Sequence, residues 1–156
     1  MRVAIISGSV SDKNVVLAAK KNLEYFDIPC DEFITSAHRS PNLTKEIALK
    51  VEKYYDASIV IAGLSAALPG ILAAYISKPV IGVPVASELM GLDALLSIAQ
   101  MPAGVPVATM GIGQKGAKNA ALFIVRLFAL NSEALRNKLN EYKIKEENKL
   151  RQLNVT

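Results

Sequence analysis

The sequence predicts a three-layer αβα fold, in which a doubly wound, five-stranded parallel sheet is covered by helices on both faces. Two observations lead to this prediction. Five short apolar segments alternate with segments whose apolar residues recur at helical spacing. The first of them, residues 2–6, is an almost continuous apolar run, which is typical of a strand buried on both faces. We therefore expect right-handed crossovers between parallel strands.

The elements of the first half follow from local patterns. After the strand at residues 2–6, apolar side chains recur with helical period as far as Phe26, and the run Asp27-Ile28-Pro29 ends this helix. Residues 31–35 have the pattern of a second strand. Pro41 suits the first turn of the next helix, and Ser40 is its predicted N-cap.

The second half repeats this alternation. Strands are expected at residues 57–62, 79–84 and 105–109, and helices at 71–76, 92–99 and 117–130. The last of these helices is apolar almost all round, so we expect it to be buried on every side, in part against another subunit. Ser132 is the predicted cap of a long charged helix at about 132–153. With no repeat or composition shift, we predict a single domain over residues 1–156.

Composition and charge exclude several classes of protein. No apolar run is long enough to span a membrane, and the first strand begins too early for a signal peptide. The chain has one cysteine and one histidine, so we expect neither an internal disulfide nor a structural metal site. The net charge of +4 lies largely in the mixed-sign last helix, which is a poor nucleic-acid surface. We expect a cytoplasmic, metal-free protein with no membrane or nucleic-acid partner.

The loop between the second strand and the second helix contains His38, the only histidine, beside Arg39. This placement joins an imidazole, a group that titrates near neutrality, to a fixed positive charge and to the amides of a helix N-terminus. A guanidinium at such a position can bind a phosphate in bidentate fashion. The loop is therefore the first candidate for a functional site.

All five loops that follow strands contain Gly or Ser residues, and in a doubly wound fold these loops form the ligand crevice. Ser9 and Ser11 offer hydroxyls for a phosphate, while Asp12 either accepts hydrogen bonds from ribose hydroxyls or caps the helix. Gly63 allows a close approach of the backbone to a ligand. Gly111 and Gly113 either do the same or form a flexible turn.

These loops contain neither a Walker phosphate loop nor a dinucleotide fingerprint, which disfavours ATP and dinucleotides. A serine hydrolase elbow is also missing. One imidazole, one guanidinium, hydroxyls and amides suit proton transfer on a small phosphorylated substrate without a bound cofactor.

Several motifs then follow one another in order across nearly the whole chain, at residues 8–12, 36–41, 62–63, 68–70, 82–85, 97–102, 104–107 and 119–122. In these motifs the chain resembles the PurE family, the N5-carboxyaminoimidazole ribonucleotide mutases of purine biosynthesis. The resemblance implies a flavodoxin-like homo-octamer whose sites are shared between subunits, with no metal or cofactor. It also implies a ribonucleotide and CO2 as partners, because the carboxylate moves from N5 to C4 through release and recapture of CO2.

The resemblance also assigns roles to residues of this chain. By its match to the family motif, His38 is the proton shuttle for C4. The remaining matches hold the ribose phosphate (Ser9, Asp12 and Arg39) or form the pocket walls (Ser36, Ala37, Gly63, Leu64 and Ser65). With Ser11 from the first loop, these are the predicted site residues.

One departure leaves the carboxyl donor open. Class I members carry a second histidine just before Leu-Pro-Gly, whereas this chain has Ala67 in a shorter loop, as in class II enzymes, which carboxylate aminoimidazole ribonucleotide directly with CO2. Arg39 and Pro41 follow class I, so we favour the mutase. A third alternative is a catalytically silent nucleotide-binding protein, against which the retained His38 argues. Lys115 is the other candidate base.

Overall fold

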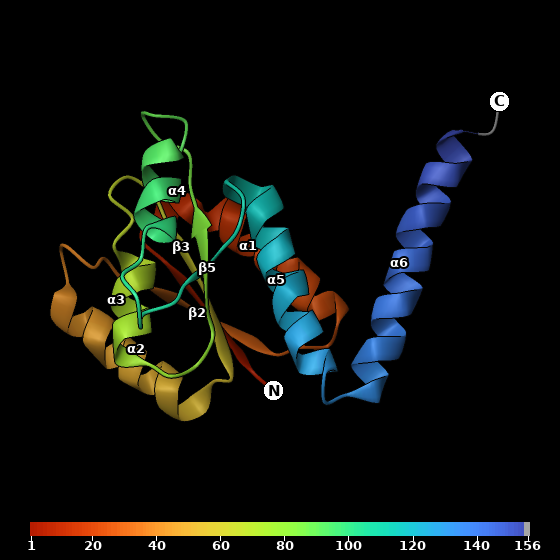
Figure 1. Cartoon of the computed structure of the whole chain (residues 1–156), viewed down its shortest axis with the longest axis horizontal. Coiled ribbons are helices and arrows are strands. Elements are labelled where there is room, and N and C mark those ends of the chain that lie inside the picture. Colours follow the sequence, from red (N-terminus) through yellow and green to blue (C-terminus); the bar gives the residue numbers. More distant parts are fainter. Residues whose placement is uncertain (155–156) are drawn as a thin grey trace.

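The structure, a computed structural model that describes residues 1–154, has the predicted three layers (Figure 1). One parallel sheet contains all five strands in the order β2-β1-β3-β4-β5. The strands are β1 (Val3–Ser7), β2 (Cys30–Ile34), β3 (Ala57–Ala62), β4 (Val80–Pro84) and β5 (Ala108–Thr109). This is the flavodoxin-like order, which confirms the predicted fold class. Residues 155 and 156, the end of the predicted domain, lie outside the described residues.

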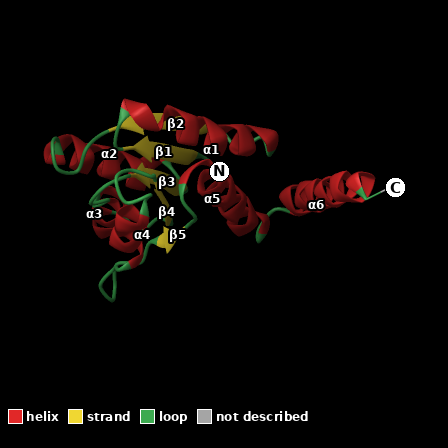
Figure 2. Cartoon of the chain, turned by 90° about the horizontal axis from the view of Figure 1, so that it is seen from above, coloured by secondary structure: helices red, strands yellow, loops and turns green. Residues whose placement is uncertain are grey.

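Helices cover both faces of the sheet (Figure 2). One face is covered by α1 (Lys13–Tyr25) and α5 (Gly113–Ala129), and the other by α2 (Pro41–Tyr54), α3 (Leu68–Tyr75) and α4 (Leu92–Ala99). A short 3₁₀ helix, η1 (Val10–Asp12), precedes α1, and α6 (Glu133–Leu153) follows α5. The crossover from β1 to β2 runs in the opposite direction to the others, so right-handed connections place α1 on the face opposite α2, α3 and α4.

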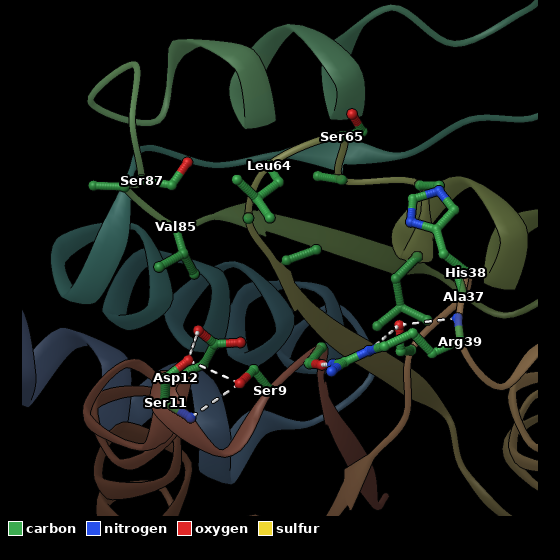
Figure 3. A pocket seen from close by; sticks show the side chains of 18 residues that line it. Ser9, Ser11, Asp12, Ala37, His38, Arg39, Leu64, Ser65, Val85 and Ser87 are labelled. Atoms are coloured by element: carbon green, nitrogen blue, oxygen red, sulfur yellow. Dashed lines mark hydrogen bonds between the residues drawn. The ribbon is translucent and has the colours of Figure 1, made fainter.

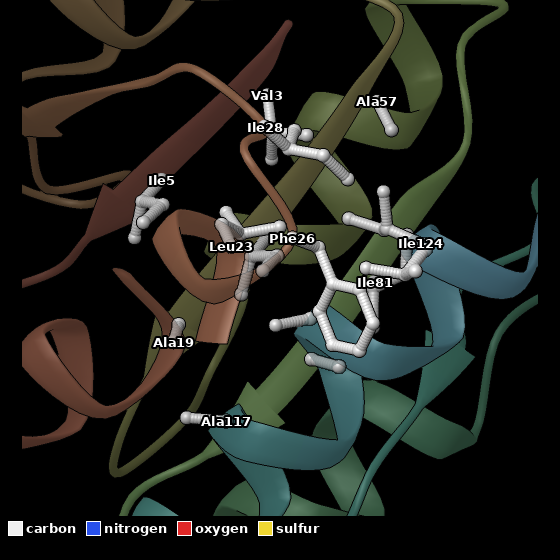
Figure 4. Packing of buried hydrophobic residues seen from close by; sticks show 14 of the residues in the cluster. Val3, Ile5, Ala19, Leu23, Phe26, Ile28, Ala57, Ile81, Ala117 and Ile124 are labelled. Carbon is white, nitrogen blue, oxygen red and sulfur yellow. The ribbon is translucent and has the colours of Figure 1, made fainter. Parts of the chain in front are cut away.

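Alternation along the strands divides the buried side chains between two cores. In β1, Val3 and Ile5 pack toward α1 and α5, while Ala4 and Ile6 pack toward α2 and α3. Figure 4 shows Phe26 in the first of these cores, close to Ile81 and Ile124. Burial on both faces is the physical reason that the central strands β1, β3 and β4 are almost continuously apolar rather than alternating.

Several predicted elements differ from the structure: α3 begins at Leu68 rather than at residue 71, and α5 begins at Gly113 rather than at residue 117. The fifth strand was expected over residues 105–109, but only Ala108 and Thr109 pair with β4. This strand lies at the edge of the sheet, and Pro106 has no N–H to donate to a ladder. Helix α5 was expected to be buried on every side, in part against another subunit; within the chain its outer face, which carries Lys118, Asn119 and Arg126, is exposed.

The C-terminal helix α6 begins at the predicted cap, where the Ser132 hydroxyl accepts a hydrogen bond from the Leu135 amide at 3.4 Å. Leu139 and Tyr142 hold its first half against the core, and the second half extends away from the sheet (Figures 1 and 2). The surface of α6 is rich in charge. No helix in the described part of the chain combines the length and the apolar character needed to cross a membrane.

We predict that Gly82→Ala destabilises the protein by about 1–3 kcal/mol, because overpacking a filled core forces its neighbours to move. A Cβ atom at this position in β4 would lie 2.4 Å from Cγ2 of the fully buried Ile98 and 3.0 Å from Val107. The matched control is Gly111→Ala, where a Cβ atom meets nothing within 4 Å. Denaturant unfolding of both variants measures the difference, and equal midpoints would contradict the expected steric cost.

Candidate functional site

A cavity of about 840 Å³ lies at the carboxyl ends of β1, β2, β3 and β4 (Figure 3). Every predicted site residue lines it, although these residues come from three separate loops. The full lining is Gly8, Ser9, Ser11, Asp12, Ser36, Ala37, His38, Arg39, Ala62, Gly63, Leu64, Ser65, Ala66, Ala67, Leu68, Val85, Ala86 and Ser87. The structure thus joins segments that are up to 79 residues apart along the chain into one site.

The pairing of β1 determines where this cavity forms. β1 lies between β2 and β3, so the direction of the chain through the sheet reverses at this strand. The Thr35 amide donates to the Ser7 carbonyl at 3.1 Å, and the Gly8 amide donates to the Ile61 carbonyl at 3.0 Å. These two bonds hold the ends of three strands together before their loops diverge, which is the usual position of a ligand crevice in this architecture.

The first loop is organised by Ser9. Its hydroxyl accepts hydrogen bonds from the Ser11 amide at 3.2 Å and the Ser11 hydroxyl at 2.9 Å, and so caps η1. Asp12 occupies the N-cap position of α1, but its side chain makes no capping hydrogen bond. Of the two roles left open by the sequence, helix capping is therefore excluded for the Asp12 carboxylate in this structure.

The Asp12 carboxylate is buried in the cavity wall, with 8% of the residue exposed. Burial raises its pKa above the ordinary value of 3.8, because desolvation disfavours the charged form, and hydrogen bonds from Ser9 and Ser11 only partly oppose this effect. Hydroxyl donors on a ligand would supply the hydrogen bonds that this carboxylate has lost to water.

The second loop presents His38 and Arg39 at the solvent-exposed side of the cavity. The Arg39 guanidinium donates from Nη2 to the Gly8 carbonyl and from Nε to the Ser36 hydroxyl, each at 3.3 Å. These bonds tie the second loop to the first. Because a guanidinium carries five N–H donors, Arg39 retains donors for an anion bound beside the Ser9 turn.

A cluster of three hydroxyls, on Thr35, Ser40 and Thr44, supports this second loop. The Thr35 hydroxyl lies 2.9 Å from that of Thr44, which is fully buried, and 3.2 Å from that of Ser40. The Ser40 hydroxyl accepts from the Ser36 amide at 3.1 Å and lies 3.1 Å from the Ser36 carbonyl. Ser40 stands at the N-cap of α2 as predicted, but its side chain makes no capping bond and instead closes the loop that holds His38.

The loop after β4 was not included in the predicted site, yet Val85, Ala86 and Ser87 line the cavity. Their position directly after a strand was the available signal, since all loops at the carboxyl edge of a parallel sheet converge. The loop after β5 does not contribute: Gly111, Gly113 and Lys115 lie outside the cavity lining.

Within the cavity, one imidazole, one guanidinium and one carboxylate stand among hydroxyls and small apolar side chains. Ser9, Ser11, Asp12 and Arg39 lie along one side in Figure 3, while Leu64 and Val85 lie along the other. Such a site can bind a phosphorylated sugar on its polar side and move a proton at the imidazole. In residues 1–154, no three side chains of His, Cys, Asp or Glu gather closely enough to hold a metal ion.

Comparison with known proteins identifies the family. Residues 2–149 match the family model described as AIR carboxylase. The N5-carboxyaminoimidazole ribonucleotide mutase of Methanocaldococcus jannaschii is 44% identical over 148 residues, which cover 95% of this chain and 92% of the relative. The chain belongs to the PurE family. The mutase of Brucella melitensis is 47% identical over 144 residues, which cover 90% of this chain and 88% of the relative.

A solved structure agrees with this PurE assignment. The crystal structure of Treponema denticola PurE superposes with a TM-score of 0.86 at 27% sequence identity, over 96% of this chain and 94% of that one. The similarity therefore extends over the sheet, the helices on both of its faces and the loops that form the cavity.

We predict that Asp12→Asn raises the thermal midpoint at pH 7 by about a degree or two, the shift expected for a fraction of a kcal/mol. Because the folded state binds the Asp12 proton more tightly than the unfolded state, stability from this group is fully present below pH 3.8 and is lost as pH rises through the higher folded pKa. Asparagine does not ionise and so does not lose stability as pH rises. The difference in thermal midpoint between the variant and the parent should therefore disappear near pH 3.

The matched control for this prediction is Glu88→Gln, which neutralises an exposed carboxylate in the loop after β4. Scanning calorimetry at pH 3, 5 and 7 should show no pH-dependent gain for this control. A midpoint for Asp12→Asn that equals or falls below that of the parent at pH 7 would mean that burial of the charge is not costly.

Proposed function

We propose that this chain converts N5-carboxyaminoimidazole ribonucleotide into 4-carboxy-5-aminoimidazole ribonucleotide, an isomerisation in purine biosynthesis. The observation that carries the proposal is the meeting of His38 and Arg39 with the Ser9 turn in one cavity. Relatives of 44–47% identity, named as mutases of this substrate, support it.

The polar side of the cavity binds the ribose phosphate in this proposal. Arg39 and the hydroxyls of Ser9 and Ser11 contact the phosphate, where charge-assisted hydrogen bonds are strongest. The Asp12 carboxylate accepts hydrogen bonds from the ribose hydroxyls, which compensate for its burial. This arrangement directs the imidazole ring of the substrate toward His38, Ala37 and the loop after β3.

His38 moves the protons in both halves of the reaction. Cleavage of the bond between N5 and the carboxylate carbon releases CO2 and leaves the electron pair on N5, which takes a proton from the His38 imidazolium. C4 then attacks CO2 to form the new carbon–carbon bond. Neutral His38 removes the C4 proton, which restores the aromatic ring and the imidazolium.

A second candidate function is direct carboxylation of aminoimidazole ribonucleotide with CO2. The observation that favours it is Ala67, which lines the cavity at the position where class I members carry a second histidine. Both reactions share the C4 carboxylation step, so the same His38 serves either one. They differ only in whether the CO2 comes from N5 of the substrate or from solution.

A spectroscopic assay with the two substrates distinguishes these functions. With N5-carboxyaminoimidazole ribonucleotide alone, we expect turnover to the C4-carboxylated product at a typical enzymatic rate of about 1–1000 per second. Turnover only of aminoimidazole ribonucleotide with bicarbonate would assign direct carboxylation instead. Absence of turnover with both would leave a nucleotide-binding protein without catalytic activity.

We predict that His38→Asn lowers the turnover rate at least 100-fold, the lower range for loss of a general acid–base group. Asparagine keeps a polar side chain of similar reach, so folding and ribonucleotide binding should be retained. The matched control is Lys115→Ala, which removes the other candidate base from an exposed position outside the cavity and should leave the rate unchanged. Retention of more than about a tenth of the parent rate in His38→Asn would exclude the proton-shuttle role.

We further propose that the chain assembles into a homo-octamer in the cytoplasm. Four apolar side chains are exposed on α4 and the loop before it, and clusters of this kind mark interaction surfaces. They are Leu89, Met90, Leu92 and Leu96. The cytoplasm is the compartment of the reaction in this proposal, because a phosphorylated ribonucleotide does not cross a bilayer unaided.

Light scattering at micromolar concentration tests the assembly. The parent chain should have the mass of an octamer, and the double variant Leu92→Glu with Leu96→Glu should have a lower mass, because it places charges in the apolar surface. A parent protein that scatters as a monomer would rule out assembly through this surface.

A further inference from the structure

Leu64 has a backbone conformation that leucine rarely adopts. Its φ angle is +54°, in the left-handed region, where a Cβ atom crowds the following carbonyl group. Gly63 precedes it directly but has no such positive φ angle. The chain therefore places the strain on a large side chain, although glycine is the residue that tolerates this conformation at no steric cost.

The surroundings of Leu64 show what the strained residue does. In the loop from Gly63 to Ala67 every other side chain is small, so the isobutyl group of Leu64 is the only bulky one. It lines the cavity, yet 59% of the residue is exposed. Figure 3 shows it between Val85 and Ser65, facing the side that carries Ser9 and Arg39. Contacts within the folded chain alone do not explain an exposed leucine held in a strained conformation.

Strained residues of this kind cluster at functional sites, where the surrounding structure maintains them. The proposed reaction has a specific need for an apolar cover: CO2 is small and apolar, and it must remain beside C4 until the new bond forms. A methyl-rich wall next to it excludes water and closes the route to solvent.

We propose that the left-handed conformation of Leu64 holds its side chain over the reacting carbons as a cover that retains CO2 between its release from N5 and its capture by C4. This inference rests on the proposed mutase function. Without the cover, the released CO2 leaves the cavity, and aminoimidazole ribonucleotide, with a proton gained at N5, is left as a second product.

The test uses the full chain with N5-carboxyaminoimidazole ribonucleotide in a buffer that contains ¹³C-bicarbonate. Mass spectrometry measures ¹³C in the product carboxylate, and chromatography measures free aminoimidazole ribonucleotide, each corrected for the reaction without protein. The parent should give mainly unlabelled product. Leu64→Gly, which keeps the backbone conformation and removes the side chain, should raise both labelling and free aminoimidazole ribonucleotide at least fivefold.

Two further variants separate the effect of the Leu64 side chain from the effect of its strained backbone conformation. Leu64→Ala shortens the side chain but keeps the Cβ atom, so it should lose CO2 as Leu64→Gly does, without the rise in thermal midpoint that relief of strain gives the glycine variant. The matched control is Asp27→Gly, at an exposed residue with a φ angle of +56° outside both the cavity lining and the proposed assembly surface. This control should leave labelling and free aminoimidazole ribonucleotide at the parent level.

The outcomes distinguish the inference from the function on which it rests. If Leu64→Gly turns over the substrate with labelling equal to that of the parent, Leu64 does not act as a cover that retains CO2, while the mutase function stands. No conversion of N5-carboxyaminoimidazole ribonucleotide by the parent would instead overturn the mutase function, and the cover with it. A fivefold rise in labelling that is confined to the two Leu64 variants supports both.

Discussion

The candidate site depends on the two hydrogen bonds that join the end of β1 to its neighbours. One runs from Thr35 to Ser7 on the side of β2, and the other from Gly8 to Ile61 on the side of β3. Since the strand order reverses at β1, the three loops that leave these strands start side by side and then diverge. The resulting opening is the cavity, and the packing of the two cores on either side of the sheet keeps its edges in register.

The site is held ready for a ligand by hydrogen bonds that form within the chain before any ligand binds. The hydroxyl cluster of Thr35, Ser40 and Thr44 closes the loop beneath His38, and Arg39 ties the same loop to Gly8. Such pre-organisation lowers the entropy lost when a substrate binds. The buried Asp12 carboxylate has the opposite character, because it is poorly solvated until hydroxyl donors reach it. This combination of a fixed cation and a poorly solvated hydrogen-bond acceptor is the one that the proposed binding of a phosphorylated ribose requires.

The chain combines features of two groups within its family. The His38–Arg39 loop keeps the family motif, whereas the loop after β3 has Ala67 at the position of a second histidine and contains the strained Leu64. The sequence contains one imidazole, so in the proposed reaction His38 alone supplies the proton for N5 and removes the proton from C4. In the same proposal, the apolar loop of small residues opposite His38 retains CO2, so that proton transfer and CO2 retention are assigned to different sides of the cavity.

The sequence by itself determined the fold class and most of the site, because both depend on local signals. Apolar runs with helical segments between them determine a covered parallel sheet, and the strand-to-helix loop around His38 is visible from Pro41 and the strand before it. Only the tertiary structure decided that the loop after β4 lines the cavity and the loop after β5 does not. It also decided that the Ser40 hydroxyl makes no capping bond to its helix and that the backbone of Leu64 has a left-handed conformation. These features depend on strand order, edge position and contacts between distant segments, which local patterns do not encode.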